Sequence, residues 1–452
     1  MRISSLASAP AGAGQRRGRD QCAAITAPQR LPATALDQLA FLFRSLSDGQ
    51  IRCVLRFDGR LDAARLERAM RLSLDAEPVL GCRFVQRRGR CVWERHPDLD
   101  RLRLCQVVAS GEPLDAALEE FLVAPLEPAT GPVVAACLLR GEADTLAIKL
   151  HHFAADGIGL LQYLMTLAAI YRELGANPDY RPRPNLAGRG QGQVLRRVGL
   201  LGIVAALRHT RPPARQAPWG PIAAGGERSG RRFALRRLGP ERVRALRAWG
   251  RAHGVSVNDL LLAALYEALA ATVGAPLGRP LTIGVPIDLR RYLPAGQALP
   301  VCNLSNSADV AVVRAAGSGF AATLRQVHAG MRAIKTTGRG LNLAVLAELL
   351  ALPALAPARA ALEGMLGRLA PTAGVSPFFS NVGVIDERLV NFGERAVIAA
   401  YGLGPVSFAP GLLVTASTFR ETLTLAVGFC DTATDPRLVE RILDRLVDEL
   451  PA

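Results

Sequence analysis

Residues 146–160 read Leu-Ala-Ile-Lys-Leu-His-His-Phe-Ala-Ala-Asp-Gly-Ile-Gly-Leu, and this stretch determines how the rest of the chain is interpreted. Four of the six residues before His152 are apolar, which predicts a mostly buried strand. Apolar residues then recur at helical spacing from Leu160 to Leu174, so the polar residues between lie where a strand runs into a helix. Because side chains alternate along a strand, His151 and His152 are expected on opposite faces.

The polar residues between strand and helix are of the types that proton transfer needs. A neutral imidazole at His152 can take a proton from a hydroxyl or an amine as that group attacks a carbonyl carbon. Asp156 stands just before the predicted helix, where a carboxylate can cap the helix or pair with an arginine. Gly157 lets a substrate approach the backbone, whose N–H can face a developing oxyanion.

Two other interpretations of the histidine pair stay open on spacing alone. A His-His pair on a strand is often a partly buried structural pair. Two histidines with a nearby carboxylate can also hold a metal ion. Adjacent strand residues diverge, so His151 and His152 cannot easily share one ion, and this weakens the metal interpretation.

Composition restricts the classes of protein that fit. With 452 residues, half of them hydrophobic, the chain is long enough for two or three domains. The net charge of +16 comes almost wholly from arginine, which favours acidic partners such as nucleotide phosphates, a carrier protein or anionic lipid. Aromatic residues make up only 5% and no recognition motif is present, so nucleic acid is not expected as a partner.

The compartment follows from cysteine use and apolar runs. The eight cysteines are scattered without a C-x-x-C pair, which predicts free thiols in a reducing, cytoplasmic compartment. No apolar run reaches about 18 residues, so no transmembrane helix is expected. A basic apolar helix over residues 194–207 is expected either to pack as a crossover helix or to contact a membrane surface or a partner.

Residues 151–157, His-His-Phe-Ala-Ala-Asp-Gly, resemble the H-H-x-x-x-D-G motif of the condensation-domain and CoA-dependent acyltransferase superfamily. Three further phrases follow in the order of that superfamily: Gly-Val-Ser-Val-Asn-Asp at 254–259, Val-Pro-Ile-Asp-Leu-Arg-Arg at 285–291 and Ser-Asn-Val-Gly at 380–383. The chain resembles a free-standing bacterial member near the wax ester synthase and polyketide-associated acyltransferase branches, and the resemblance runs from about residue 34 to 450.

The resemblance implies an α/β fold with two chloramphenicol-acetyltransferase-like lobes, arranged as a V around a central tunnel. Together with the shifts in composition, it divides the chain into four parts. These are a disordered tail at 1–33, an N-terminal lobe at 34–178, a crossover linker with a short basic helix at 179–229 and a C-terminal lobe at 230–452.

The resemblance also implies an activity. An acyltransferase of this kind moves an acyl group from acyl-CoA, or from the phosphopantetheine arm of an acyl carrier protein, to the hydroxyl or amine of a small-molecule acceptor. It needs no tightly bound cofactor and no metal. Two alternatives belong to other classes: a non-catalytic module with the condensation fold that binds a carrier protein, and a metal-dependent hydrolase.

Site residues carried over from the resemblance lie in both halves of the chain. His152 is the expected general base, and His151 is expected to be structural. In relatives an arginine of the second half pairs with the motif aspartate; this role is carried to Arg290, with Arg291 as the fallback. Ser380 or Asn381 is expected to hydrogen-bond the substrate.

Overall fold

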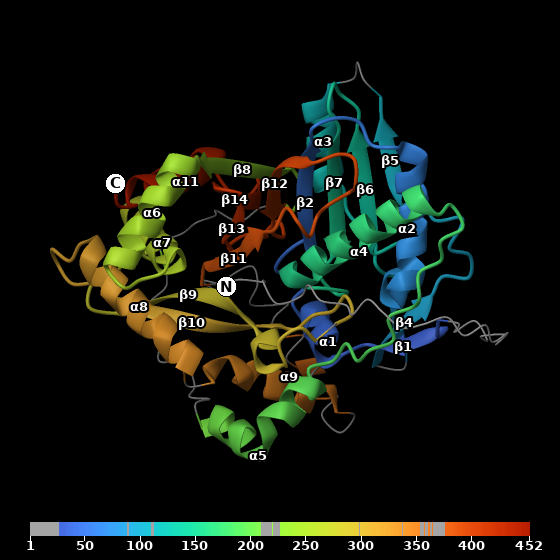
Figure 1. The fold of residues 1–452 in the computed structure, drawn as a ribbon. Helices are drawn as coiled ribbons and strands as arrows, with labels where there is room; N and C mark the ends of the chain where they lie inside the picture. Colours follow the sequence, from blue (N-terminus) through green and yellow to red (C-terminus); the bar gives the residue numbers. More distant parts are fainter. Residues whose placement is uncertain are drawn as a thin grey trace.

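The structure, a computed structural model, describes residues 27–87, 90–109, 113–208, 219, 227–297, 299–336, 338–352, 357, 360–361, 364 and 376–452. These residues form two α/β lobes, each built on its own sheet (Figure 1). The seven cysteines among them form no disulfide.

The N-terminal lobe is built on a five-stranded sheet in the order β12-β2-β7-β6-β5. Its strands are β2 (Gln50–Phe57), β5 (Cys105–Val108), β6 (Val134–Leu139), β7 (Thr145–His151) and β12 (Val397–Leu403). Its helices are α1 (Ala35–Leu42), α2 (Ala63–Ala76), α3 (Leu114–Val123) and α4 (Gly157–Ala176). A separate three-stranded sheet joins β1 (Arg30–Pro32), β4 (Arg90–Arg95) and β3 (Cys82–Arg87).

The predicted histidine strand is β7, at the centre of this sheet between β2 and β6. Leu146, Ile148 and Leu150 are fully buried there, which explains the nearly continuous apolar run in the sequence. The strand ends at His151, and α4 begins at Gly157 with Asp156 as its N-cap. The predicted passage from strand to helix is therefore confirmed.

The C-terminal lobe is built on a six-stranded sheet in the order β10-β9-β11-β13-β14-β8. Its strands are β8 (Arg231–Leu238), β9 (Pro280–Asp288), β10 (Ser305–Val313), β11 (Phe378–Ile385), β13 (Leu413–Phe419) and β14 (Thr422–Cys430). Its helices are α6 (Pro240–Ala252), α7 (Val257–Thr272), α8 (Phe320–Thr336) and α11 (Pro436–Asp448). Ser256 and Asp259 form a capping box that starts α7, as their spacing predicts.

One strand of the N-terminal sheet comes from the second half of the chain. β12 belongs by sequence to the second half, but it pairs antiparallel with β2, with Tyr401 opposite Val54. It also contacts β13 of the other sheet, so it lies between the two lobes. The predicted division assigns all of residues 230–452 to the C-terminal lobe, so it does not place β12 in the N-terminal sheet.

A third group of helices lies below both sheets in Figure 1. It comprises α5 (Gly192–Arg208), α9 (Asn342–Ala351) and the short 3-10 helices η2 (Leu289–Tyr292) and η3 (Arg339–Leu341). Within the described chain, no single helix has the length and apolar character to cross a bilayer; α6 and α7, bent by 101° at their junction, meet that measure only as a pair.

Pro78–Gly81 forms the 3-10 helix η1 ahead of β3, since proline fixes φ and offers no N–H to a sheet. One predicted boundary was wrong. Arg30–Pro32, within the predicted tail, forms β1 against β4. Residues 1–26 of that tail, and most of residues 209–226 in the predicted linker, lie outside the described residues.

Candidate active site

A cavity of about 280 Å³ lies between the lobes, with walls from α1, β2 and α4 on one side and β9, β10, β11 and β13 on the other. Its walls are mostly apolar, and include Leu36, Leu39, Phe43, Leu160, Phe378 and Leu413. A few polar side chains share these walls, among them Arg52, His152, Asn303, Ser380 and Thr415. Polar interactions are stronger in such an apolar enclosure than in water.

His152 is the first residue after β7 and lines the cavity. Its backbone N–H donates to Gly49 O at 2.6 Å, and its carbonyl accepts from Asn303 Nδ2 at 2.7 Å. The backbone of His152 is therefore held from both lobes. Its Nδ1 is buried and has no hydrogen-bond partner among the described residues.

His151 points into the protein instead. Its ring packs edge-on against Phe153 at 4.1 Å between centroids, and its Nδ1 accepts from Phe153 N at 3.2 Å. Burial, with smaller effects of the His152 and Arg52 charges, lowers the pKa of His151 to about 3. His151 therefore lies away from the cavity, and its structural role stays a prediction.

Asp156 is fully enclosed at the start of α4. Its Oδ1 accepts from Gly159 N at 2.8 Å, and its Oδ2 accepts from Leu304 N at 2.8 Å and Arg290 Nη1 at 2.9 Å. Burial opposes ionisation, but Arg290 and these hydrogen bonds keep the pKa of Asp156 below its usual value. Arg290 thus occupies the position expected of it, whereas Arg291 donates to Lys335 O at the surface.

Of the three remaining predicted site residues, Gly157 and Ser380 line the cavity and Asn381 does not. Gly157 lines the cavity at a crowded point, because a Cβ there would lie 2.9 Å from Val382 Cγ1. Ser380 also lines the cavity. Asn381 is not among the lining residues; its Oδ1 accepts from Gly383 N at 2.9 Å and stabilises a turn.

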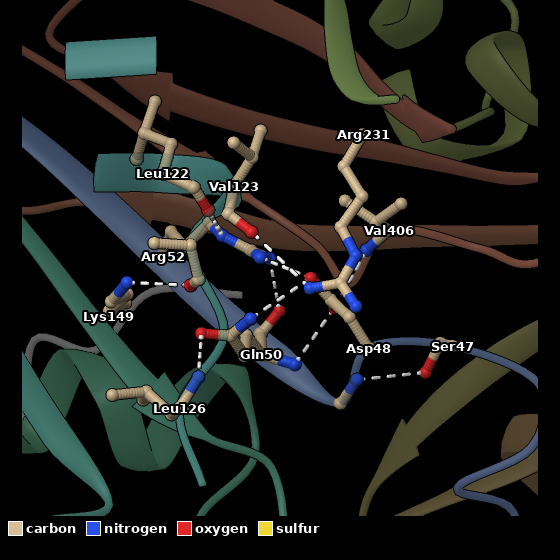
Figure 2. Close-up of polar contacts among 12 residues, drawn as sticks. Ser47, Asp48, Gln50, Arg52, Leu122, Val123, Leu126, Lys149, Arg231 and Val406 are labelled. Atoms are coloured by element: carbon tan, nitrogen blue, oxygen red, sulfur yellow. Dashed lines mark hydrogen bonds and ion pairs between the residues drawn. The ribbon is translucent and has the colours of Figure 1, made fainter. Parts of the chain in front are cut away.

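A buried polar cluster holds the segment that carries Gly49 (Figure 2). Arg52 donates to the Asp48 carboxylate and, through Nε, to Leu122 O at 2.6 Å. Asp48 Oδ1 accepts from Val406 N at 3.0 Å, which brings in the C-terminal half of the chain. Burial lowers the pKa of Arg52, although the Asp48 charge opposes this. The cluster fixes the backbone of Gly49, whose carbonyl receives the His152 N–H.

Sequence reasoning missed Asn303. It is 3% exposed, and its Nδ2 donates to the carbonyls of His152 and Phe153. The signal in the sequence was a set of polar residues at alternating positions, Asn303, Ser305 and Ser307, just before and at the start of β10. All three residues line the cavity.

Metal ligation has no obvious ligand set here. Among the described residues, no three His, Cys, Asp or Glu side chains are grouped closely enough to hold an ion. The hydrolase alternative, which needs His151 and His152 on one metal, conflicts with the different surroundings of the two rings.

Comparison with known proteins gives weak sequence similarity. No known protein-family model matches the sequence. The uncharacterized protein Rv2305 of Mycobacterium tuberculosis is 27% identical over 275 residues, which are 58% of this chain and 62% of that protein. Gramicidin S synthase 2 of Aneurinibacillus migulanus is 27% identical over 130 residues, 28% of this chain and 3% of that protein. The chain thus spans less than two thirds of the length of both relatives.

Solved structures are similar over nearly the whole chain. Polyketide synthase associated protein 5 from Mycobacterium tuberculosis has a TM-score of 0.63 at 17% identity and covers 92% of this chain and 98% of its own. The first condensation domain of the CDA synthetase has a TM-score of 0.66 at 18% identity and covers 94% and 95%. The starter condensation domain of rhizomide synthetase RzmA has a TM-score of 0.66 at 16% identity and covers 93% of each.

The chain therefore has the condensation-domain fold, and the predicted α/β architecture of two chloramphenicol-acetyltransferase-like lobes is confirmed. A position near the wax ester synthase branch stays a prediction.

Proposed function

We propose that this chain is an acyltransferase that moves an acyl group from a thioester to a hydroxyl or amine acceptor, forming an ester or an amide. The observation that carries the proposal is His152, held from both lobes in the wall of a mostly apolar cavity. The starter condensation domain of rhizomide synthetase was solved in complex with C8-CoA and Leu-SNAC, which supports a thioester donor for this fold. The donor here is acyl-CoA or an acyl carrier protein.

In the proposed reaction the His152 ring takes the proton of the acceptor O–H or N–H while the oxygen or nitrogen forms a bond to the thioester carbon. The carbonyl becomes an oxyanion, which the backbone N–H of Gly157 can stabilise. Collapse of this intermediate breaks the C–S bond, and the departing sulfur takes the proton back from the imidazolium. The products are the ester or amide and a free thiol.

The ion pair of Asp156 and Arg290 has a supporting role in this scheme. Asp156 caps α4 and binds the backbone of Leu304, so it positions the loop that carries His152 without touching the reacting atoms. The apolar lining of the cavity favours acyl groups with a hydrocarbon chain over charged ones. Ser380 is a candidate hydrogen-bonding partner of the substrate because it lies in the same wall.

The test is thiol release by the purified chain from acyl-CoA donors of increasing length, with alcohol and amine acceptors. His152→Ala should lower kcat by about 10²–10⁴-fold. His253→Ala is the matched control, since it removes an exposed imidazole that stacks on Trp249. A loss below roughly tenfold in a folded His152→Ala protein would exclude His152 as the base. Binding of a carrier protein without any thioester consumption would favour the non-catalytic alternative.

A further inference from the structure

Helix α5 presents large apolar side chains to solvent. Leu200 and Leu201 are 76% and 87% exposed, and Val204 and Leu207 are exposed as well. Gly199, with φ of 73°, divides the helix into two arms, and these side chains belong to the second arm. Leu200, Val204 and Leu207 follow the i, i+4, i+7 spacing of one helix face.

The opposite side of this arm is the one that packs on the protein. Ala206 is 1% exposed and lies in a cluster with residues of α1 and α9. The second arm therefore contacts the protein through a small side chain and directs its large apolar ones away from it. This is the reverse of the usual arrangement for a helix on the surface of a globular protein.

Basic residues flank the apolar face. Arg196 and Arg197 on the first arm are exposed, and so is Arg291 on η2, which packs against α5. Helix α5 contains no acidic residue, and the whole chain carries a net charge of +16. Leucines beside arginines, without acids, are typical of a helix that lies in the surface of an anionic bilayer.

The neighbouring helix α9 connects this surface to the cavity. Leu346 and Leu349 of α9 are each 42% exposed, and α9 packs against α5. Leu343 of the same helix lines the cavity. One helix thus contributes both to the exposed apolar surface and to the wall around the candidate active site.

We infer that the α5–α9 surface, comprising Leu200, Leu201, Val204, Leu207, Leu346 and Leu349 with Arg196 and Arg197 at its edge, docks the protein on anionic lipid bilayers. A symmetric contact between two copies would also bury these leucines. Helices α5 and α9 carry one acidic residue, Glu348, against Arg196, Arg197 and Arg208, so such a contact would bring together more arginines than acids. An anionic bilayer accepts both the leucines and the arginines. This inference does not depend on the proposed acyl transfer.

The experiment is sedimentation of the full chain with vesicles of phosphatidylcholine, pure or with one third phosphatidylglycerol. We expect binding to the anionic vesicles, weakened by added salt. Leu201→Gln should weaken it roughly tenfold, since an inserted leucine loses its apolar burial. Leu277→Gln is the matched control, because Leu277 is 55% exposed on the loop between α7 and β9. It should bind like the wild type.

The charge contribution has its own pair of variants. Arg196→Gln with Arg197→Gln should weaken binding to anionic vesicles by roughly 10- to 30-fold. Arg437→Gln with Arg441→Gln removes the same charge from exposed positions on α11, which Figure 1 shows far from α5, and should have a much smaller effect. All four variants change exposed side chains, so their thermal unfolding should match the wild type.

Three results would overturn the inference. One is no binding to anionic vesicles at low salt. The second is equal loss in the α5 variants and their controls, which would indicate attraction by net charge alone. The third is a dimer in sedimentation velocity that Leu201→Gln dissociates, without vesicle binding; the surface would then be an interface between copies.

Discussion

Arg290 Nη1 lies 2.9 Å from Asp156 Oδ2, and this ion pair connects the C-terminal lobe to the helix start that follows His152. Arg290 also donates to Cys302 O at 3.0 Å, and Asp156 accepts from Leu304 N. The pair therefore fastens the segment at 302–304 to the histidine loop. Both side chains are almost fully buried, so the pair offsets much of their loss of hydration; Arg290 has a second carboxylate partner in Asp288, at 3.2 Å.

Asp156→Asn should lower the free energy of unfolding by about 3 kcal/mol, because the buried Arg290 loses its 2.9 Å partner and keeps only Asp288, 3.2 Å from its Nη1. Urea unfolding followed by circular dichroism measures this loss. Glu421→Gln breaks the exposed pair with Arg244 and should cost no more than about 1 kcal/mol. A stable Asp156→Asn protein that has lost activity would instead give Asp156 a direct part in the chemistry.

Asn303 should act as a positioning residue for His152. Asn303→Asp keeps the shape of the side chain but replaces the amide donor by a carboxylate oxygen facing two carbonyls. We expect kcat to fall by roughly 10–100-fold with a smaller change in KM, since the His152 loop moves while the rest of the cavity stays. Steady-state kinetics of thioester consumption measures the changes in kcat and in KM separately.

Gln191→Glu is the comparison for Asn303, because Gln191 is also buried and donates from Nε2 to Ala344 O at 2.6 Å, and it does not line the cavity. It should cost comparable stability with a smaller loss of kcat. Equal losses of kcat in the two variants would show that Asn303 has no special relation to His152.

Short motifs explain why part of this site could be predicted from sequence. His152, Asp156 and Gly157 lie within six residues of one another, and the alternation of a strand separates the two histidines. The pairing of Arg290 with Asp156 came from resemblance, because nothing local in the sequence joins residues 134 positions apart. Asn303 contacts His152 across 151 positions, and was not found.

The place of β12 in the N-terminal sheet could not be predicted for the same reason. A strand's own sequence reports its burial and alternation, but not which sheet it joins. β12 reaches β2 across more than 300 positions, in the register that opposes Tyr401 and Val54. Contacts of this range are set by tertiary packing, which local patterns do not encode.

A side chain at position 49 should destabilise the folded protein. The φ of Gly49 is +61°, and a Cβ would lie 3.0 Å from Cε1 of the buried His151 ring. Gly254→Ala is a matched control, with φ of +67° and no atom within 4 Å of the new Cβ, so it should cost about 1–2 kcal/mol from backbone strain alone. Gly49→Ala should cost more and should also lower kcat, because the Gly49 carbonyl receives the His152 N–H. Equal unfolding free energies for the two variants would contradict the contact with His151.

Glu77 should make the stability of the fold depend on pH. Glu77 is the C-cap of α2, and its carboxylate accepts hydrogen bonds from Val301 N at 3.0 Å and from Asn185 Nδ2 at 3.3 Å. Burial raises the pKa of Glu77 to about 7, against the opposing effect of these two hydrogen bonds and of Arg189. The folded state therefore keeps a proton that the unfolded state loses near the ordinary glutamate pKa of about 4.3.

Between about pH 4.5 and pH 7 the unfolded chain binds fewer protons at this position than the folded chain, so stability should fall as pH rises through this window. Glu77→Gln removes that titration. The difference in unfolding free energy between Glu77→Gln and the wild type should shift in favour of the variant by up to about 3 kcal/mol from pH 4.5 to pH 7.5. Urea unfolding at both pH values measures this shift, with Glu241→Gln on the exposed surface of α6 as the control for losing one carboxylate. A difference that stays constant with pH, or that moves in favour of the wild type, would mean that Glu77 is already ionised in the folded protein and is stabilised by Val301 and Asn185.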